Sequence, residues 1–124
     1  MSASSPTEVH ERLAEAFSTG DMRAFLALHE PESTQVVPPD RRHVTGTEEI
    51  RRAVEPFLSM RPKFETEVVG VLESDGLAMT HALWRLEGTD RDGKPVTLAG
   101  LGTVVSRRQP DGSWRIVLDN PLSP

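Results

Sequence analysis

The fold is decided by residues 74–113, SDGLAMTHALWRLEGTDRDGKPVTLAGLGTVVSRRQPDGS, where turn signals alternate with β-rich runs. Three Asp-Gly steps punctuate this stretch, at residues 75–76, 92–93 and 111–112. An Asp-Gly step between two β-like runs is among the strongest local signals for a hairpin. Strands are therefore expected over residues 64–73, 77–87, 96–108 and 113–120, joined in chain order as an antiparallel meander.

The sequence before this meander carries helix signals. Ser5 is a suitable N-cap, Pro6 suits the first turn and Glu8 completes a capping box. Apolar residues then recur at helical spacing until Gly20, which predicts the end of the helix. A second short helix is expected after Asp21, ending before residue 31.

Two further elements are expected before the meander. Residues 34–37 form a short β-like run closed by Pro38-Pro39, and the polar stretch 40–46 is expected to be a loop. A third helix is predicted from Thr47, with Pro56 expected to kink or shorten it. Helices first and a meander afterwards predict an α+β fold, with the helices against one face of the sheet. Long strands coil, so the sheet is expected to be strongly curved and to leave either a ligand cavity or an interior filled by side chains.

Composition excludes several classes of function. The chain has 124 residues, which suits one domain, and no cysteine, which excludes disulfides and thiolate chemistry. Its net charge of −5, with no clustered basic face, argues against nucleic-acid binding. No apolar run approaches a membrane span, so the default location is cytoplasmic. No metal-ligand spacing is found, and no cofactor is expected.

Three stretches carry a resemblance to a known family. They are AFSTGD at residues 16–21, VTGTEEI at 44–50 and RRQPDGSWRIV at 107–117. In this order and spacing the chain resembles the SnoaL-like, ketosteroid-isomerase-like branch of the nuclear transport factor 2 (NTF2) superfamily. The resemblance implies one domain over residues 1–124, with an ordered core at about 6–121. It also implies a cystatin-like, cone-shaped barrel, a homodimer and a pocket between sheet and helices. Members include isomerases, cyclases, hydrolases, dehydratases and non-catalytic binders, so the fold alone does not decide the chemistry.

The chain departs from the isomerases of that family. They use a carboxylate just before a proline, where this chain has Val37-Pro38, and commonly a Tyr at the oxyanion site, whereas this chain has no Tyr. A standard ketosteroid isomerase mechanism is therefore not expected. Asp40 is the nearest carboxylate and substitutes for the base only if its loop folds back over the pocket.

The last strand offers candidate site residues through its alternation. Period-two geometry puts Trp114, Leu118 and Asn120 on one face with an isoleucine between them, and Asp119 on the other. The apolar members mark the core side, so Asn120 is expected at the core or the pocket mouth, or simply as the residue that ends the strand. Asp119 is expected to be a surface or dimer-face residue.

The strand over residues 77–87 leaves its orientation open, because both of its faces are largely apolar. If the face with His81 meets the helices, His81 is the best candidate base. If the other face does, Trp84 lines the pocket and His81 faces solvent or a partner subunit.

Three hypotheses follow. The first is a domain that binds a small hydrophobic organic molecule without proven catalysis, with an apolar lining drawn from Trp84, Trp114, Phe17, Phe25, Phe57 and Leu118. The second is a general acid/base enzyme (isomerase, cyclase or hydrolase type) acting on a polycyclic or enolisable ketone, with His81, Asp40 and Asn120 as catalytic residues. The third is a non-catalytic dimerisation module.

Overall fold

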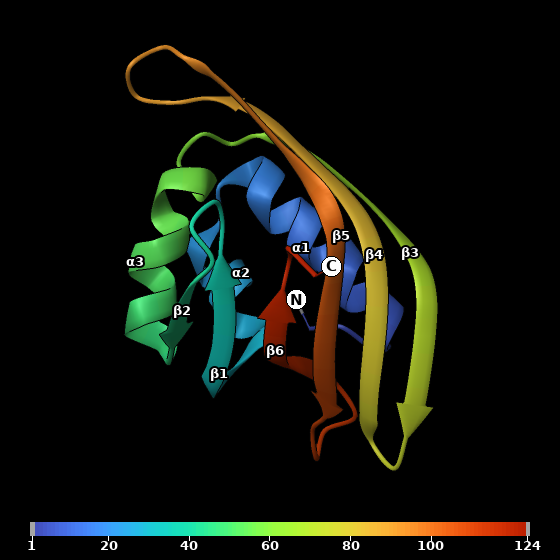
Figure 1. Ribbon diagram of the computed structural model, residues 1–124. Coiled ribbons are helices and arrows are strands. Elements are labelled where there is room, and N and C mark those ends of the chain that lie inside the picture. Colours follow the sequence, from blue (N-terminus) through green and yellow to red (C-terminus); the bar gives the residue numbers. More distant parts are fainter. Residues whose placement is uncertain (1, 124) are drawn as a thin grey trace.

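The computed structural model describes residues 2–123 and confirms the α+β class (Figure 1). Three helices, α1 (Pro6–Thr19), α2 (Met22–Ala27) and α3 (Thr47–Leu58), pack against one sheet. The sheet contains six strands: β1 (His29–Val37), β2 (Arg42–Thr45), β3 (Lys63–Ser74), β4 (Leu77–Thr89), β5 (Pro95–Arg108) and β6 (Trp114–Asn120).

The sheet is mixed and open, with strand order β2-β1-β6-β5-β4-β3. The predicted meander of β3 to β6 is present, but β1 pairs with β6 in parallel, so an antiparallel sheet was the wrong prediction. The predicted loop over residues 40–46 contains β2, which pairs with β1 because a tight turn after Pro38-Pro39 reverses the chain. Since β2 and β3 lie at opposite edges and do not pair, the sheet does not close into the expected cone-shaped barrel.

Local capping explains why the helices begin and end where they do. The Ser5 hydroxyl accepts a hydrogen bond from the Glu8 N–H at 3.1 Å, and Gly20 ends α1 in the left-handed region at φ 68°. The Asp21 carboxylate accepts from the Ala24 N–H at 3.0 Å and begins α2. These caps confirm the predicted helix boundaries.

The alternation of β4 decides which face of the sheet meets the helices. Ala78, Thr80 and Ala82 are each 2% exposed or less, whereas Leu83 is 49% exposed. The covered face, here called the inner face, is the one that carries Trp84 and Leu86. His81 therefore lies on the opposite, outer face.

A β-bulge reverses the alternation of β6. Val105 pairs with Leu118 and Ser106 pairs with Ile116, so Val117 is an extra residue with no partner on β5. A bulge of one residue moves every later side chain to the other face. Ile116 is fully buried, but Leu118 is 49% exposed, and Asp119 instead of Asn120 is directed to the inner face.

Candidate functional site

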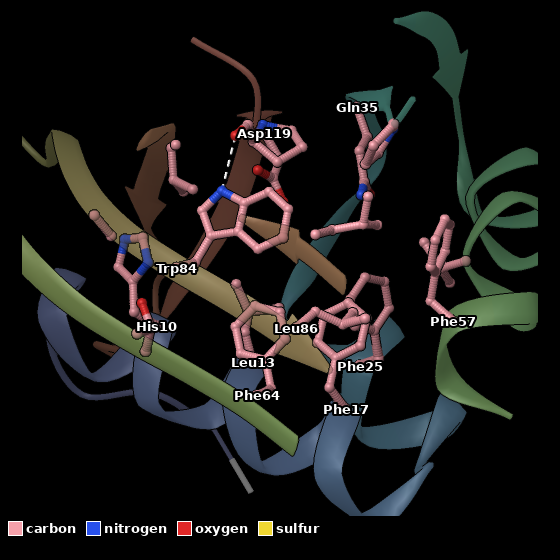
Figure 2. Close-up of a pocket in the computed structure, with 18 of the residues that line it drawn as sticks. His10, Leu13, Phe17, Phe25, Gln35, Phe57, Phe64, Trp84, Leu86 and Asp119 are labelled. Carbon is pink, nitrogen blue, oxygen red and sulfur yellow. Dashed lines mark hydrogen bonds between the residues drawn. The ribbon is translucent and has the colours of Figure 1, made fainter. Parts of the chain in front are cut away.

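A cavity of about 80 Å³ lies between the helices and the inner face of the sheet (Figure 2). All three helices and five strands contribute to its lining. Its aliphatic lining includes Leu13, Val37, Val54, Leu86 and Leu98. The engineered cavity that holds benzene in another protein measures about 150 Å³, so one ring fits here only if side chains move.

The aromatic residues of the chain gather at this cavity. All four phenylalanines line it, at positions 17, 25, 57 and 64, together with Trp84. Phe17 stacks on Phe64 with ring centroids 4.6 Å apart, and Phe64 is nearly parallel to Trp84 at 6.0 Å. Phe25 meets Phe17 edge to face at 5.4 Å. Phe64 is therefore parallel to both Phe17 and Trp84, and these three side chains give part of the cavity an aromatic lining.

Asp119 supplies a carboxyl group to this apolar cavity. Its side chain is half-buried, and within residues 2–123 it makes no hydrogen bond or ion pair. Burial therefore raises the pKa of the Asp119 carboxyl from 3.8 to about 7. A carboxyl with this pKa is present in both protonation states at neutral pH, which suits a group that takes up and returns a proton.

Gln35 lies beside Asp119 on the neighbouring strand. The two residues are partners in the parallel register of β1 and β6, and both line the cavity. Gln35 is 6% exposed, and its Oε1 is buried without a hydrogen-bond partner. A buried amide oxygen without a partner is costly, so a molecule in the cavity that bonds to this amide would gain binding energy.

His10 lines the cavity from α1. Its Nε2 lies 2.6 Å from the Thr80 hydroxyl of β4, and the side chain is 4% exposed. Burial lowers the pKa of His10 from 6.5 to about 4, so the imidazole is neutral at pH 7. In Figure 2, His10 and Gln35 lie on opposite sides of Trp84.

The C-terminal segment after β6 closes part of the cavity. Pro121 lines it, and the Trp84 indole Nε1 donates to the Pro121 carbonyl at 2.8 Å, the dashed line in Figure 2. From the β1–β2 turn, Arg41 Nη1 donates to the Leu122 carbonyl at 2.7 Å. The indole orientation thus depends on the chain beyond the last strand.

The structure separates the predicted catalytic residues from the cavity. His81 and Asn120 lie in one row of the outer face, where both pair with Thr103, and His81 Nδ1 is 3.1 Å from the Thr103 hydroxyl. Asp40 is exposed in the turn before β2, beside Arg42. None of the three lines the cavity. His81 is on the outer face of β4, the bulge in β6 directs Asn120 to the same face, and the turn that carries Asp40 does not fold over the cavity.

Four of the six side chains expected in an apolar lining lie at the cavity. Trp84, Phe17, Phe25 and Phe57 line the cavity. Trp114 is 5% exposed but packs in the core before the bulge, and Leu118 faces outward beyond it. That any of these residues binds a ligand stays a prediction.

Three cavity residues were not predicted from the sequence as site residues: His10, Gln35 and Asp119. Gln35 lies in the predicted strand over residues 34–37, and its alternation with Val37 was the available signal. His10 follows Val9 and precedes Leu13 on the apolar side of α1, so its spacing indicated burial. Asp119 gave no such signal, since the bulge at Val117 depends on pairing with β5.

Two negative findings concern residues 2–123. No three His, Cys, Asp or Glu side chains lie close enough together to hold a metal ion. No helix in this part of the chain is long and apolar enough to cross a membrane.

The fold and cavity define the class of protein: an NTF2-like α+β fold with a small aromatic cavity and one lone carboxyl group. The chain belongs to the SnoaL-like domain family, because the model of that domain matches residues 10–117. No curated protein matches it significantly.

Solved structures agree on the fold. A conserved protein from Planctomyces limnophilus is 22% identical, with a TM-score of 0.80 over 94% of this chain and 91% of that one. A ketosteroid isomerase-like protein from Erwinia carotovora atroseptica is 19% identical, with a TM-score of 0.76 over 95% and 94%. An NTF2-like protein of unknown function from Shewanella oneidensis is 17% identical, with a TM-score of 0.75 over 94% and 95%. At these identities the likeness concerns the fold alone.

Proposed function

We propose that this protein binds a small, largely apolar organic molecule in the cavity and transfers a proton on it through Asp119. One observation carries the proposal: a carboxyl group without a partner, in an aromatic cavity, with its pKa raised to about 7. Such an arrangement is costly for folding and is typical of groups that act as general acid or base. The substrate class that fits is a monocyclic or smaller ketone with an acidic α-proton.

The chemistry follows from the two neighbouring polar groups. The Asp119 carboxylate removes a proton from the carbon next to the carbonyl, and the electron pair of that C–H bond moves to form the enolate. The Gln35 amide, turned so that its NH₂ end faces the ligand, donates a hydrogen bond to the enolate oxygen. Asp119 then returns the proton to the same or a conjugated carbon, so atoms and charge balance.

Size distinguishes this proposal from the polycyclic alternative. A cavity of about 80 Å³ is too small for fused rings in this arrangement of side chains. The catalytic set is also different from the predicted one, because His81, Asp40 and Asn120 are outside the cavity. The similarity to a structure described as ketosteroid isomerase-like supports proton transfer as the reaction class, by analogy of fold.

The test is hydrogen–deuterium exchange of cyclohexanone in D₂O, followed by proton NMR. The wild-type protein is expected to accelerate exchange at the α-carbon, and Asp119→Asn is expected to lower this rate about 100-fold or more. Asp40→Asn, which removes an exposed carboxyl outside the cavity, is the matched control and should keep the wild-type rate. Equal rates for wild type and Asp119→Asn would refute the catalytic role.

A homodimer through the outer face is proposed separately. Leu72, Met79, Val105 and Leu118 form one row across β3, β4, β5 and β6. Leu72 is 71% exposed, and Met79, Leu83 and Leu118 are 39–49% exposed. An apolar row of this length on an uncovered sheet is typical of an association surface, and a second copy supplies a matching row.

A further inference from the structure

His10 is a buried polar group that the proposed proton transfer does not use. It lies on α1, is 4% exposed and lines the cavity. Its Nε2 is 2.6 Å from Thr80 Oγ1, and no carboxylate contacts it within the described residues. The question is what its second ring nitrogen, Nδ1, does.

The hydrogen bonds of Thr80 indicate which ring nitrogen of His10 carries the hydrogen. The Thr80 hydroxyl donates to the Val104 carbonyl at 3.3 Å, and a hydroxyl has only one proton to donate. The contact with His10 can then be made only if His10 Nε2 is the donor. Both hydrogen bonds exist together only in the Nε2–H tautomer.

The free nitrogen is therefore an acceptor. A neutral imidazole has one N–H, and burial lowers the pKa of His10 to about 4, so Nδ1 keeps its lone pair at pH 7. In the described part of the chain Nδ1 makes no hydrogen bond. His10 lines the cavity, so a donor group on a molecule in the cavity can bond to this lone pair.

We propose that His10 Nδ1 accepts a hydrogen bond from a hydroxyl group of the ligand and so determines its specificity. This inference rests on the proposed function, since it requires a ligand in the same cavity. In Figure 2, Gln35 lies on the other side of Trp84 from His10, and Asp119 lies beside the indole; these two groups suit a carbonyl oxygen and its α-carbon. The substrate class is thereby narrowed to a small hydroxylated ketone, oriented with its hydroxyl toward α1.

The test compares phenol with toluene, which have nearly the same shape but differ in a hydroxyl donor. Affinities are measured by NMR titration for the wild type, His10→Phe and Thr80→Val. His10→Phe is expected to weaken phenol about tenfold, the loss for one hydrogen bond left unmade, and to leave toluene within about twofold. Thr80→Val removes the same internal hydrogen bond but keeps the imidazole, so phenol should lose less than in His10→Phe.

Several outcomes would overturn the inference. One is a parallel change for phenol and toluene in His10→Phe, and another is an equal phenol loss in both variants. A third is a phenol loss in Asp119→Asn but not in His10→Phe, because the hydroxyl would then bind to Asp119 and not to His10.

A measurement on the unmutated protein guards against misfolding of a variant. The ¹⁵N chemical shifts of His10 report its tautomer and are expected to show hydrogen on Nε2 only. Phenol, but not toluene, should move the Nδ1 resonance, and hydrogen on Nδ1 would refute the assignment. If neither molecule enters the cavity, the proposed function fails as well. If both enter without preference, only the role of His10 fails.

Discussion

The two faces of β4 have similar hydrophobicity but different properties. The inner face presents Thr80, Ala82, Trp84 and Leu86 to the helices. The Thr80 hydroxyl on this face contacts the buried His10 imidazole. The outer face presents mainly aliphatic side chains that are 39–49% exposed and the His81–Thr103 pair. The apolar residues of a strand face therefore do not indicate whether that face is buried. Burial depends on the elements that cover the face, and it determines how much each side chain contributes to stability and how far its pKa shifts.

The largest expected effect contrasts two leucines of β4. Leu86→Ala on the inner face removes a side chain that is 2% exposed, and should lower the free energy of unfolding by about 2–5 kcal/mol. Leu83→Ala on the outer face, 49% exposed in the single chain, should lower it by less than about 1 kcal/mol at protein concentrations where the chain is monomeric. Urea unfolding monitored by tryptophan fluorescence provides both values. Equal losses would mean that the outer face is also buried, for example in a stable dimer.

The second effect is the pH dependence that Asp119 gives to the free energy of unfolding. The folded protein keeps the Asp119 proton up to about pH 7, whereas the unfolded chain loses it near pH 3.8. Because the native state binds more protons between these values, the Asp119 contribution to stability falls as pH rises from about 4 to 7. Asp119→Asn should therefore be more stable than the wild type at pH 8, by on the order of 2 kcal/mol.

Two buried histidines oppose this trend in the same pH range. Burial lowers the pKa values of His10 and His29 to about 4, so their contributions to stability rise with pH from about 4 to 6.5. The difference between Asp119→Asn and wild type isolates the carboxyl from both. Unfolding curves at pH 5 and pH 8 measure it, and a difference that does not change with pH would show that Asp119 titrates normally.

The third effect concerns the outer face alone. Leu83→Lys places a charge among the exposed aliphatic residues and should weaken self-association at least about tenfold, with little change in monomer stability. Thr7→Lys, at an exposed position of α1, is the matched charge control. Light scattering over a concentration series measures the dissociation constant. If wild type and both variants are monomers at the highest concentration, the proposed dimer is wrong.

The smallest effect concerns the helix that covers the inner face. Ser5→Ala removes the N-cap of α1 and should cost about 1 kcal/mol of stability, because the Glu8 N–H loses its acceptor. Ser18→Ala changes an exposed serine of the same helix and should cost nothing. Thermal unfolding compares the two variants, and a Ser18→Ala loss as large as that of Ser5→Ala would contradict the capping role.

Short-range signals in the sequence predicted the local structure of this protein. Asp-Gly turns, the Ser5 and Asp21 caps and Gly20 depend on hydrogen bonds and dihedral angles within a few residues, so the helices and β3 to β6 were predicted close to their observed bounds. The order of these elements also carried the family resemblance, which the domain match over residues 10–117 confirmed.

The site, in contrast, depends on how distant parts of the chain pack together. Which face of β4 is inner, the parallel pairing of β1 with β6 and the bulge at Val117 all depend on contacts between residues far apart in the chain. Together they bring Asp119 and Gln35 into the cavity and leave His81 and Asn120 outside it. A single unpaired residue in β6 reverses every later side chain, and the alternation of β6 alone does not indicate that residue.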